Sequence, residues 1–204
     1  MLSAKPLREV IAAFASAEPT PGGGSASALA SAVAASLLLM VAGLEKTRNQ
    51  SEDDRAALTS AAAALTRIQH QLTAAIDADS EAYDQVVSAY RQPKTTDVEK
   101  TARKAGIERA LRTATDIPLG VMRLTVDALK HAQAVAAHGH RAASSDVGVA
   151  LALLQAGLEG ARLNVRVNIG SISDRAYVEA VTAESERLSG QMSGLVRDAI
   201  ASMG

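Results

Sequence analysis

Apolar residues recur with helical spacing along most of the chain. The first such run places four apolar residues on one helix face: Leu7, Val10, Ile11 and Phe14. Residues 26–44 carry no charge and are apolar on every side, so we expect a central helix there. No alternating stretch is long enough for a strand. The pattern therefore predicts an all-α fold, with a single domain over residues 1–204 built as a bundle of about six to seven helices.

Helix-start signals divide the rest of the chain. Ser51 is expected to open a long helix that runs to about Tyr90. Thr96-Asp97-Val98-Glu99 is a capping box, in which the first and last side chains bind free amides at a helix start. Pro118 suits the first turn of a separate helix, because that position needs no amide donor. The remaining helices are expected over residues 144–169 and 174–202.

Composition removes several classes of function. The chain has 204 residues, a net charge of -1 and no cysteine, so disulfides and thiolate metal sites are excluded and a cytoplasmic location is expected. The charge balance and the scarcity of aromatic residues argue against a nucleic-acid partner. His138 and His140 have no third ligand in view, so no metal is expected. Residues 26–44 have the length of a membrane span, but they are mostly Ala and Ser, which favours a buried helix and no membrane partner.

The strongest local signal for chemistry is the motif Pro21-Gly22-Gly23-Gly24-Ser25, at the start of the central helix. Free amides and the helix dipole favour an anion or a polarised oxygen at such a place, and glycine lets a ligand approach the backbone. Ser25 is expected to be the N-cap of the helix. A tight turn between helices explains the same residues, and both interpretations stay open.

A carboxylate interrupts the apolar stripe of the long helix. Its members are spaced by three or four residues: Leu72, Ile76, Asp79, Tyr83, Val86, Val87 and Tyr90. The spacing predicts that Asp79 points inward with the tyrosines, while Asp77, Glu81 and Asp84 lie on a solvated face. A carboxylate on a core face needs a partner or shifts its pKa, so Asp79 is a candidate acid, base or cation stabiliser. A structural ion pair or hydrogen bond is the equal alternative.

A third set of candidates lies on the helix over residues 144–169. Asp146 and Asn164 share one face, which small residues continue as far as Asn168, and Arg166 belongs to an adjacent charged stripe. The small residues suit close helix packing or a ligand groove. Asp146 and Asn164 are separated by about 27 Å of helix, so within one chain they cannot touch the same reacting atom. Asp146 also fits the role of a first-turn helix stabiliser.

Taken together, these stretches resemble one family, which contains the cyclodeaminase domain of formimidoyltransferase-cyclodeaminase and the free-standing methenyltetrahydrofolate cyclohydrolases. The resemblance rests on blocks that follow one another along nearly the whole chain: Pro19-Thr20-Pro21-Gly22-Gly23-Gly24-Ser25, Asp79-Ser80-Glu81-Ala82-Tyr83-Asp84, Ala89-Tyr90-Arg91-Gln92-Pro93-Lys94, Pro118-Leu119, Ser145-Asp146-Val147-Gly148-Val149-Ala150 and Gly160-Ala161-Arg162-Leu163-Asn164-Val165-Arg166-Val167-Asn168. Two places depart from the family pattern, the stretch Glu45-Lys46-Thr47-Arg48-Asn49-Gln50 and His140 before the Ser-Asp block.

The resemblance implies an enzyme that opens or closes a carbon–nitrogen bond on a one-carbon unit carried by tetrahydrofolate. Asp79 would be the carboxylate beside the cationic carbon–nitrogen system. The glycine loop with Ser25 would hold an oxygen of the folate, and Asp146, Asn164, Arg166 and Asn168 would line its binding site. The expected partners are a tetrahydrofolate derivative, with or without a polyglutamate tail, and a second copy of the chain in a homodimer, with no cofactor beyond the folate substrate. The alternatives are a folate-binding homologue with altered catalysis and a helical interaction module.

Overall fold

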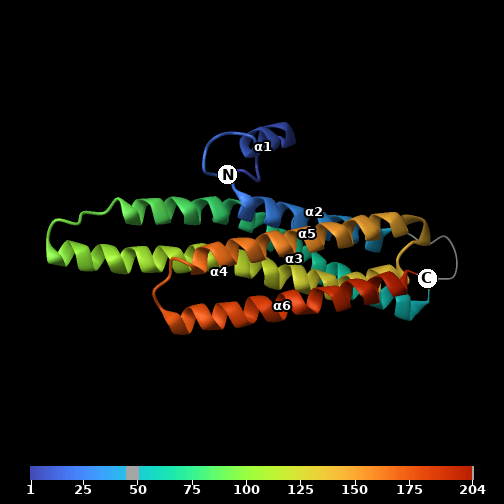
Figure 1. Ribbon diagram of the computed structural model, residues 1–204. Coiled ribbons are helices and arrows are strands. Elements are labelled where there is room, and N and C mark those ends of the chain that lie inside the picture. Colours follow the sequence, from blue (N-terminus) through green and yellow to red (C-terminus); the bar gives the residue numbers. More distant parts are fainter. Residues whose placement is uncertain (45–50, 204) are drawn as a thin grey trace.

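The computed structural model describes residues 1–44 and 51–203. Within them the chain forms six α-helices, one short 3-10 helix and no strand (Figure 1). The elements, in order, are α1 (Leu7–Phe14), α2 (Gly23–Gly43), α3 (Glu52–Tyr90), α4 (Asp97–His138), η1 (Arg141–Ala143), α5 (Ser144–Ile169) and α6 (Arg175–Ser202). The predicted all-α bundle is confirmed. Residues 45–50, where the sequence departs from the family pattern, lie outside the described residues.

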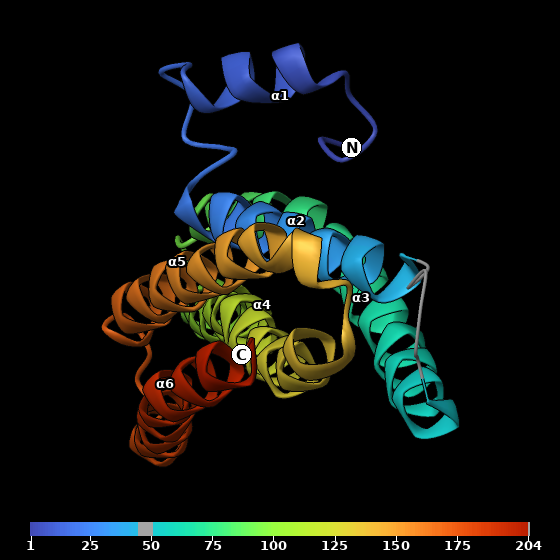
Figure 2. The same ribbon diagram turned by 90° about the vertical axis from the view of Figure 1, so that its right-hand side faces the viewer.

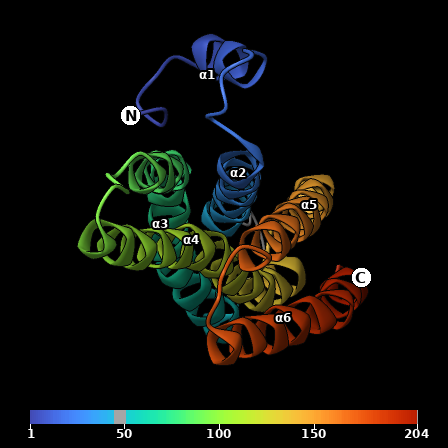
Figure 3. The ribbon, with the colours of Figure 1, turned by 60° about the vertical axis from the view of Figure 1, so that its left-hand side comes forward.

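The central helix of the bundle is α4, which packs against α2, α3, α5 and α6, so the expectation of a central apolar helix at residues 26–44 is wrong. Helix α2 lies nearer the surface, with Val33 and Met40 exposed. It packs against α3, α4 and α5 and runs between α3 and α5 (Figure 3). Its side chains Leu38 and Val41 are among the most deeply buried in the chain. By length and composition alone α2 could cross a membrane, with a mean hydropathy of 2.0. In this structure 44% of that apolar stretch is buried, and the side that it buries packs against the three neighbouring helices.

Small residues allow α2 and α5 to approach closely. A Cβ added at Gly157 would lie 2.1 Å from Ser31 Oγ, and one added at Gly160 would lie 2.3 Å from Ser27 Oγ. A larger residue at Gly157 would push the helices apart, because its Cβ would also lie 2.9 Å from the Ser27 carbonyl oxygen, and one at Gly160 would have to displace the Ser27 hydroxyl. The expectation that the small-residue face of α5 serves close helix packing is confirmed, and this contact fixes α5 beside the N-terminal half of α2.

The start signals of α3 and α4 act as predicted. Ser51 and Asp54 form a reciprocal capping box at the start of α3, and Thr96 and Glu99 form one at the start of α4. The prediction that Pro118 begins a separate helix is wrong, because α4 continues through it. Proline has no amide to donate to the carbonyl four residues earlier, which would leave the Ala114 oxygen without its helical partner. Asn168 Nδ2 on α5 donates to that oxygen at 2.7 Å, and the helix is maintained.

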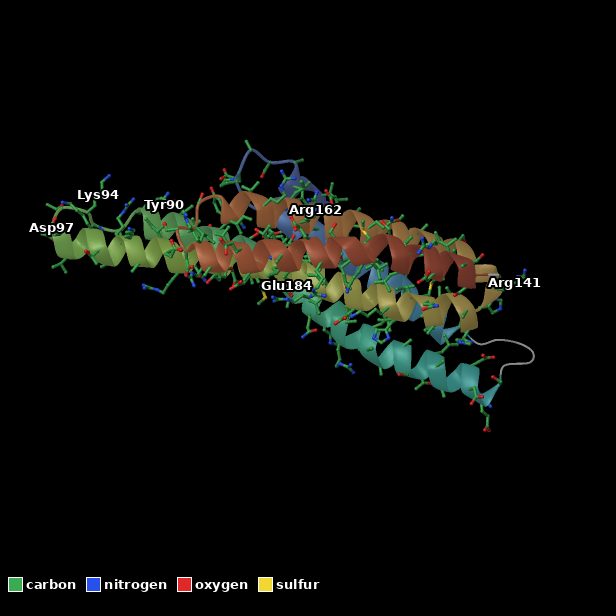
Figure 4. The ribbon with its side chains drawn as sticks, turned by 60° about the horizontal axis from the view of Figure 1, so that its bottom comes forward. Tyr90, Lys94, Asp97, Arg141, Arg162 and Glu184 are labelled. Atoms are coloured by element: carbon green, nitrogen blue, oxygen red, sulfur yellow. The ribbon has the colours of Figure 1, made fainter. Side chains whose placement is uncertain are left out.

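The far ends of α3 and α4 form a long antiparallel arm that projects past the other helices (Figure 1). Tyr90, Lys94 and Asp97 mark its tip, and Arg141 lies at the opposite end of the molecule (Figure 4). Tyr83 and Tyr90 are 40% and 48% exposed, so the prediction that they point into the core is wrong. The apolar stripe of α3 is regular, but beyond Asp79 only α4 runs beside α3, and no other helix among the described residues covers the stripe (Figure 1).

Asp77 lies on a different face of α3 from Asp79, as predicted, but the expectation that it is solvated is wrong. Its carboxylate is buried and accepts hydrogen bonds from the backbone amides of Leu2 and Ser3 and from the Ser3 hydroxyl. These bonds attach the N-terminal segment to α3, while α1 itself stands away from the bundle (Figure 2). The sequence pattern could not reveal this, because the covering segment lies more than seventy residues away.

Candidate functional site

The glycine motif forms the N-terminus of α2. The helix begins at Gly23 with Gly22 as its N-cap, and no side chain of its own caps it. Ser25 is therefore the third residue of the helix, and the prediction that it is the N-cap is wrong. Helix starts leave their first amides without intrahelical partners. In this helix, the partner of one of those amides comes from another element.

Asp79 of α3 supplies that partner. The Ser25 amide donates to Asp79 Oδ2 at 2.8 Å, and Ser25 Oγ lies 3.0 Å from the same oxygen. Ser25 Oγ also lies 2.9 Å from the Ile76 carbonyl, one turn earlier on α3. The buried serine therefore links the start of α2 to the middle of α3, and one carboxylate oxygen is held from two sides.

Gly24 lets the carboxylate lie directly against the backbone of α2. A Cβ at this position would fall 2.0 Å from Asp79 Oδ1, a distance that no side chain can occupy. Asp79 Oδ1 accepts no hydrogen bond from the residues that the structure describes, whereas Oδ2 accepts those of Ser25. The carboxylate therefore has one anchored oxygen and one oxygen that is available to another molecule.

Burial raises the pKa of Asp79 above its ordinary value, although the side-chain and backbone hydrogen bonds from Ser25 act in the opposite direction. No charged side chain among the described residues contributes to this shift. A carboxyl group whose pKa is raised by burial can be protonated and deprotonated nearer neutral pH, which suits an acid–base catalyst.

Asn164 of α5 borders the same helix start. Its Nδ2 would lie 3.2 Å from a Cβ at Gly23, and this amide group donates to the Gly160 carbonyl at 2.8 Å. That bond orients the side chain, and its oxygen takes no donor from the described residues. The glycine loop, Ser25, Asp79 and Asn164 thus meet from three elements that are distant in sequence.

Comparison with known proteins assigns this chain to a family. The family model described as formiminotransferase-cyclodeaminase matches residues 6–187. The chain belongs to this family. Its match covers every motif block that carried the resemblance in the sequence, including the glycine loop, the Asp79 block and the final block of α5.

Named relatives carry two activities. The chain is 38% identical to a methenyltetrahydrofolate cyclohydrolase of Methylorubrum extorquens, over 85% of this chain and 84% of the relative. It is 30% identical to formimidoyltransferase-cyclodeaminase of Gallus gallus over 86% of this chain, which spans only 32% of that longer protein. The fold is also that of a formiminotetrahydrofolate cyclodeaminase from Thermotoga maritima, with a TM-score of 0.88, 24% identity and coverage of 100% and 98% of the two chains.

Three other candidate residues lie apart from this family's glycine loop. Arg166 lines a cavity of about 250 Å³ between α5 and α6, together with Arg162 and Thr182. It points away from Asn164 because two residues on a helix are about 200° apart. Asn168 is bound to the Ala114 carbonyl of α4. Asp146 lies in the first turn of α5, at the other end of that helix. Their proposed contacts with folate stay predictions.

One neighbour of the site was missed by the sequence argument. Ser80 Oγ lies 3.3 Å from Ser25 Oγ, which adds a second hydroxyl next to the serine that binds the Asp79 carboxylate. Its position directly after Asp79 in the family motif was the available signal. Across residues 1–44 and 51–203, no three His, Asp or Glu side chains gather in a way that could hold a metal ion. A reaction without a metal stays a prediction.

Proposed function

We propose that this protein is a folate-dependent one-carbon enzyme, and that its first substrate is methenyltetrahydrofolate, which it hydrolyses. The cyclohydrolase that matches most of both chains supports this choice of substrate. The observation that carries the chemistry is Asp79, half-buried against Gly24, with Oδ2 bound by Ser25 and Oδ1 available.

The proposed reaction needs one group that first accepts and then donates a proton. Water attacks the cationic methenyl carbon between N5 and N10, and Asp79 Oδ1 takes a proton from that water. The resulting carbinol breaks its bond to N5, and the proton returns from Asp79 to N5. The product is a formyl group on N10, and the second water proton leaves to solvent. Before the attack, the ionised carboxylate also stabilises the cationic carbon–nitrogen system.

Cyclodeamination is the second candidate, because the family and several relatives bear that name. In that reaction N10 attacks the carbon of the protonated formimino group on N5, and ammonia leaves to give the methenyl cation. The same carboxylate would take the proton from N10 and pass it to the departing nitrogen. Both reactions pass through an amidine-type carbon, so the Asp79 geometry supports either one.

The rest of the site would bind and orient the folate. The glycine amides at the start of α2 and the Asn164 oxygen offer a donor and an acceptor to the polar edge of the pterin. We expect the enzyme to work as a homodimer in the cytoplasm, on tetrahydrofolate with or without a polyglutamate tail.

One assay separates the alternatives. Purified protein is incubated with methenyl- and formimino-tetrahydrofolate side by side, and the absorbance of the methenyl form is followed. Loss of that absorbance above the uncatalysed rate establishes the cyclohydrolase, and its appearance from the formimino compound establishes the cyclodeaminase. Binding without turnover of either compound would leave a folate-binding homologue. Absence of both binding and turnover would leave a helical interaction module.

A further inference from the structure

A second cavity lies on the face of α3 beside the loop that leads into α2. Its volume is about 430 Å³, and it is lined by six residues: Pro19, Tyr83, Asp84, Val87, Ser88 and Arg91. Pro19 belongs to the glycine-loop segment, and the other five residues belong to the projecting end of α3 or follow it directly. The cavity is thus bounded by the same two segments that form the Asp79 site.

The cavity continues a row of side chains that starts at Asp79. Asp79, Tyr83, Val87 and Arg91 are spaced by four residues, which gives a slanted ridge along a helix. The row covers about 18 Å of helix axis. Arg91 is the C-cap of α3 and keeps a helical backbone conformation. Because helical Cα–Cβ bonds tilt towards the N-terminus, its long side chain can reach back towards Asp79 and shorten that span.

The chemical character of the row changes along its length. Tyr83 and Val87 offer an aromatic and an aliphatic surface, and Tyr83 is exposed within this chain. Arg91 is exposed and forms no ion pair with the residues that the structure describes, so its guanidinium is free to bind a carboxylate bidentately. Asp84 and Ser88 add an acceptor and a hydroxyl between these two regions.

We propose that this row is the binding site for the tail of the folate, the benzoyl ring and the glutamate that follow N10. The inference rests on the proposed function, which places the one-carbon unit at Asp79. The ring would lie against Tyr83 and Val87, the amide N–H would donate to Asp84, and a glutamate carboxylate would bind Arg91. Benzoyl, amide and glutamate together extend roughly 10 Å at ordinary bond lengths, which suits a row that Arg91 shortens when its side chain reaches back.

Asp84 is the feature that opposes the proposal, because its charge repels the glutamate. It follows Tyr83 directly and stands two helical turns before Arg91, nearer the expected amide than the carboxylate. An acceptor is needed at the amide and a cation at the carboxylate, so the order of the two charges along α3 matches the order of groups in the tail.

The test compares tetrahydrofolate with its dimethyl ester, in which the tail keeps its length but loses both charges. Equilibrium dissociation constants are measured for the wild-type protein and for Arg91→Gln. The wild type should bind the free acid more tightly than the ester. Arg91→Gln should weaken binding of the free acid by about tenfold or more and leave the ester unchanged. Arg109→Gln, an exposed arginine on α4, is the matched control and should keep the wild-type preference.

Tyr83 gives a second, independent readout. Tyr83→Ala should weaken binding of the acid and the ester alike, because both carry the ring, and Tyr83→Phe should restore both. An Arg91→Gln variant that affects acid and ester equally, or neither, would overturn the proposal. Wild-type binding of the acid in preference to the ester without turnover would refute the proposed reaction but keep the tail site. Turnover without any preference between acid and ester would keep the proposed reaction but refute the tail site. Wild-type protein that binds neither compound would refute both proposals.

Discussion

Asp79→Asn separates the two roles that the structure gives to this side chain. Asparagine has nearly the same shape, and its amide oxygen can still accept the hydrogen bonds of the Ser25 amide and hydroxyl. The substitution removes the charge and the ability to exchange a proton. The link between α2 and α3 should therefore survive, while the chemistry should not.

The expected loss falls on kcat and amounts to about 100-fold or more, or about 2.7 kcal/mol of transition-state stabilisation. The stability of the variant at neutral pH should not fall. The folded pKa of Asp79 is raised by burial, so its contribution to stability is present at low pH and is lost as pH rises through the folded pKa. Asparagine cannot ionise. The melting temperature of Asp79→Asn at neutral pH should therefore equal or exceed that of the wild type.

Asp77→Asn is the matched control, since it changes a buried carboxylate two residues away on the same helix. Burial raises the pKa of Asp77, but hydrogen bonds from Ser3 and Leu2 outweigh it, and the net shift is downward. Its contribution to stability is therefore present at neutral pH and is lost as pH falls through the folded pKa. Asp77→Asn should lower the melting temperature at pH 7 and leave kcat per folded molecule unchanged. An Asp79→Asn protein with wild-type kcat and a depressed melting temperature would remove Asp79 from the mechanism.

Three further predictions concern packing and assembly. Gly24→Ala should lower kcat by roughly tenfold or more and should also lower the melting temperature, because the new methyl group displaces the Asp79 carboxylate. Gly148→Ala is the control, since nothing lies within 4 Å of its added Cβ. It should leave kcat unchanged and leave the melting temperature unchanged or higher. Asn168→Ala should cost about 1–3 kcal/mol in chemical denaturation by leaving the Ala114 carbonyl without its donor, and adding Pro118→Ala should recover part of that loss; equal losses with and without the proline would show that the bond is unimportant. Light scattering at micromolar concentration should give the mass of a homodimer, and a monomer would contradict that expectation.

The features that could be predicted from the sequence are those that depend on nearby residues. Capping boxes at Ser51 and Thr96 mark helix starts because donor and acceptor lie within one turn. The apolar spacing of α3 correctly set Leu72 and Ile76 in the core and Asp79 on the face turned towards α2. Helix geometry also shows that Asn164 and Arg166, two residues apart, point to opposite sides of α5. The sequence interpretation that placed both in one site did not take this into account.

The features that could not be predicted depend on partners elsewhere in the chain. Pro118 lies inside a continuous helix because a donor from α5 replaces the missing hydrogen bond. Asp77 is buried by the N-terminal segment. Tyr83 and Tyr90 are exposed because α3 and α4 extend beyond the ends of the neighbouring helices. The periodicity of one helix carries no information about the length of another.

The structural and chemical interpretations of Asp79 are compatible because its two oxygens are in different environments. Oδ2 accepts one of the free amides at the start of α2, where no side chain of that helix does so. Oδ1 lies against bare glycine backbone and is available to a ligand. Fixing one oxygen in this way orients the other without further loss of side-chain freedom when substrate binds, which is the advantage of a preorganised catalytic group. The Cβ of any other residue at position 24 would fall on Oδ1, so Gly24 is what allows the carboxylate to keep this oxygen free while Oδ2 stays anchored to Ser25.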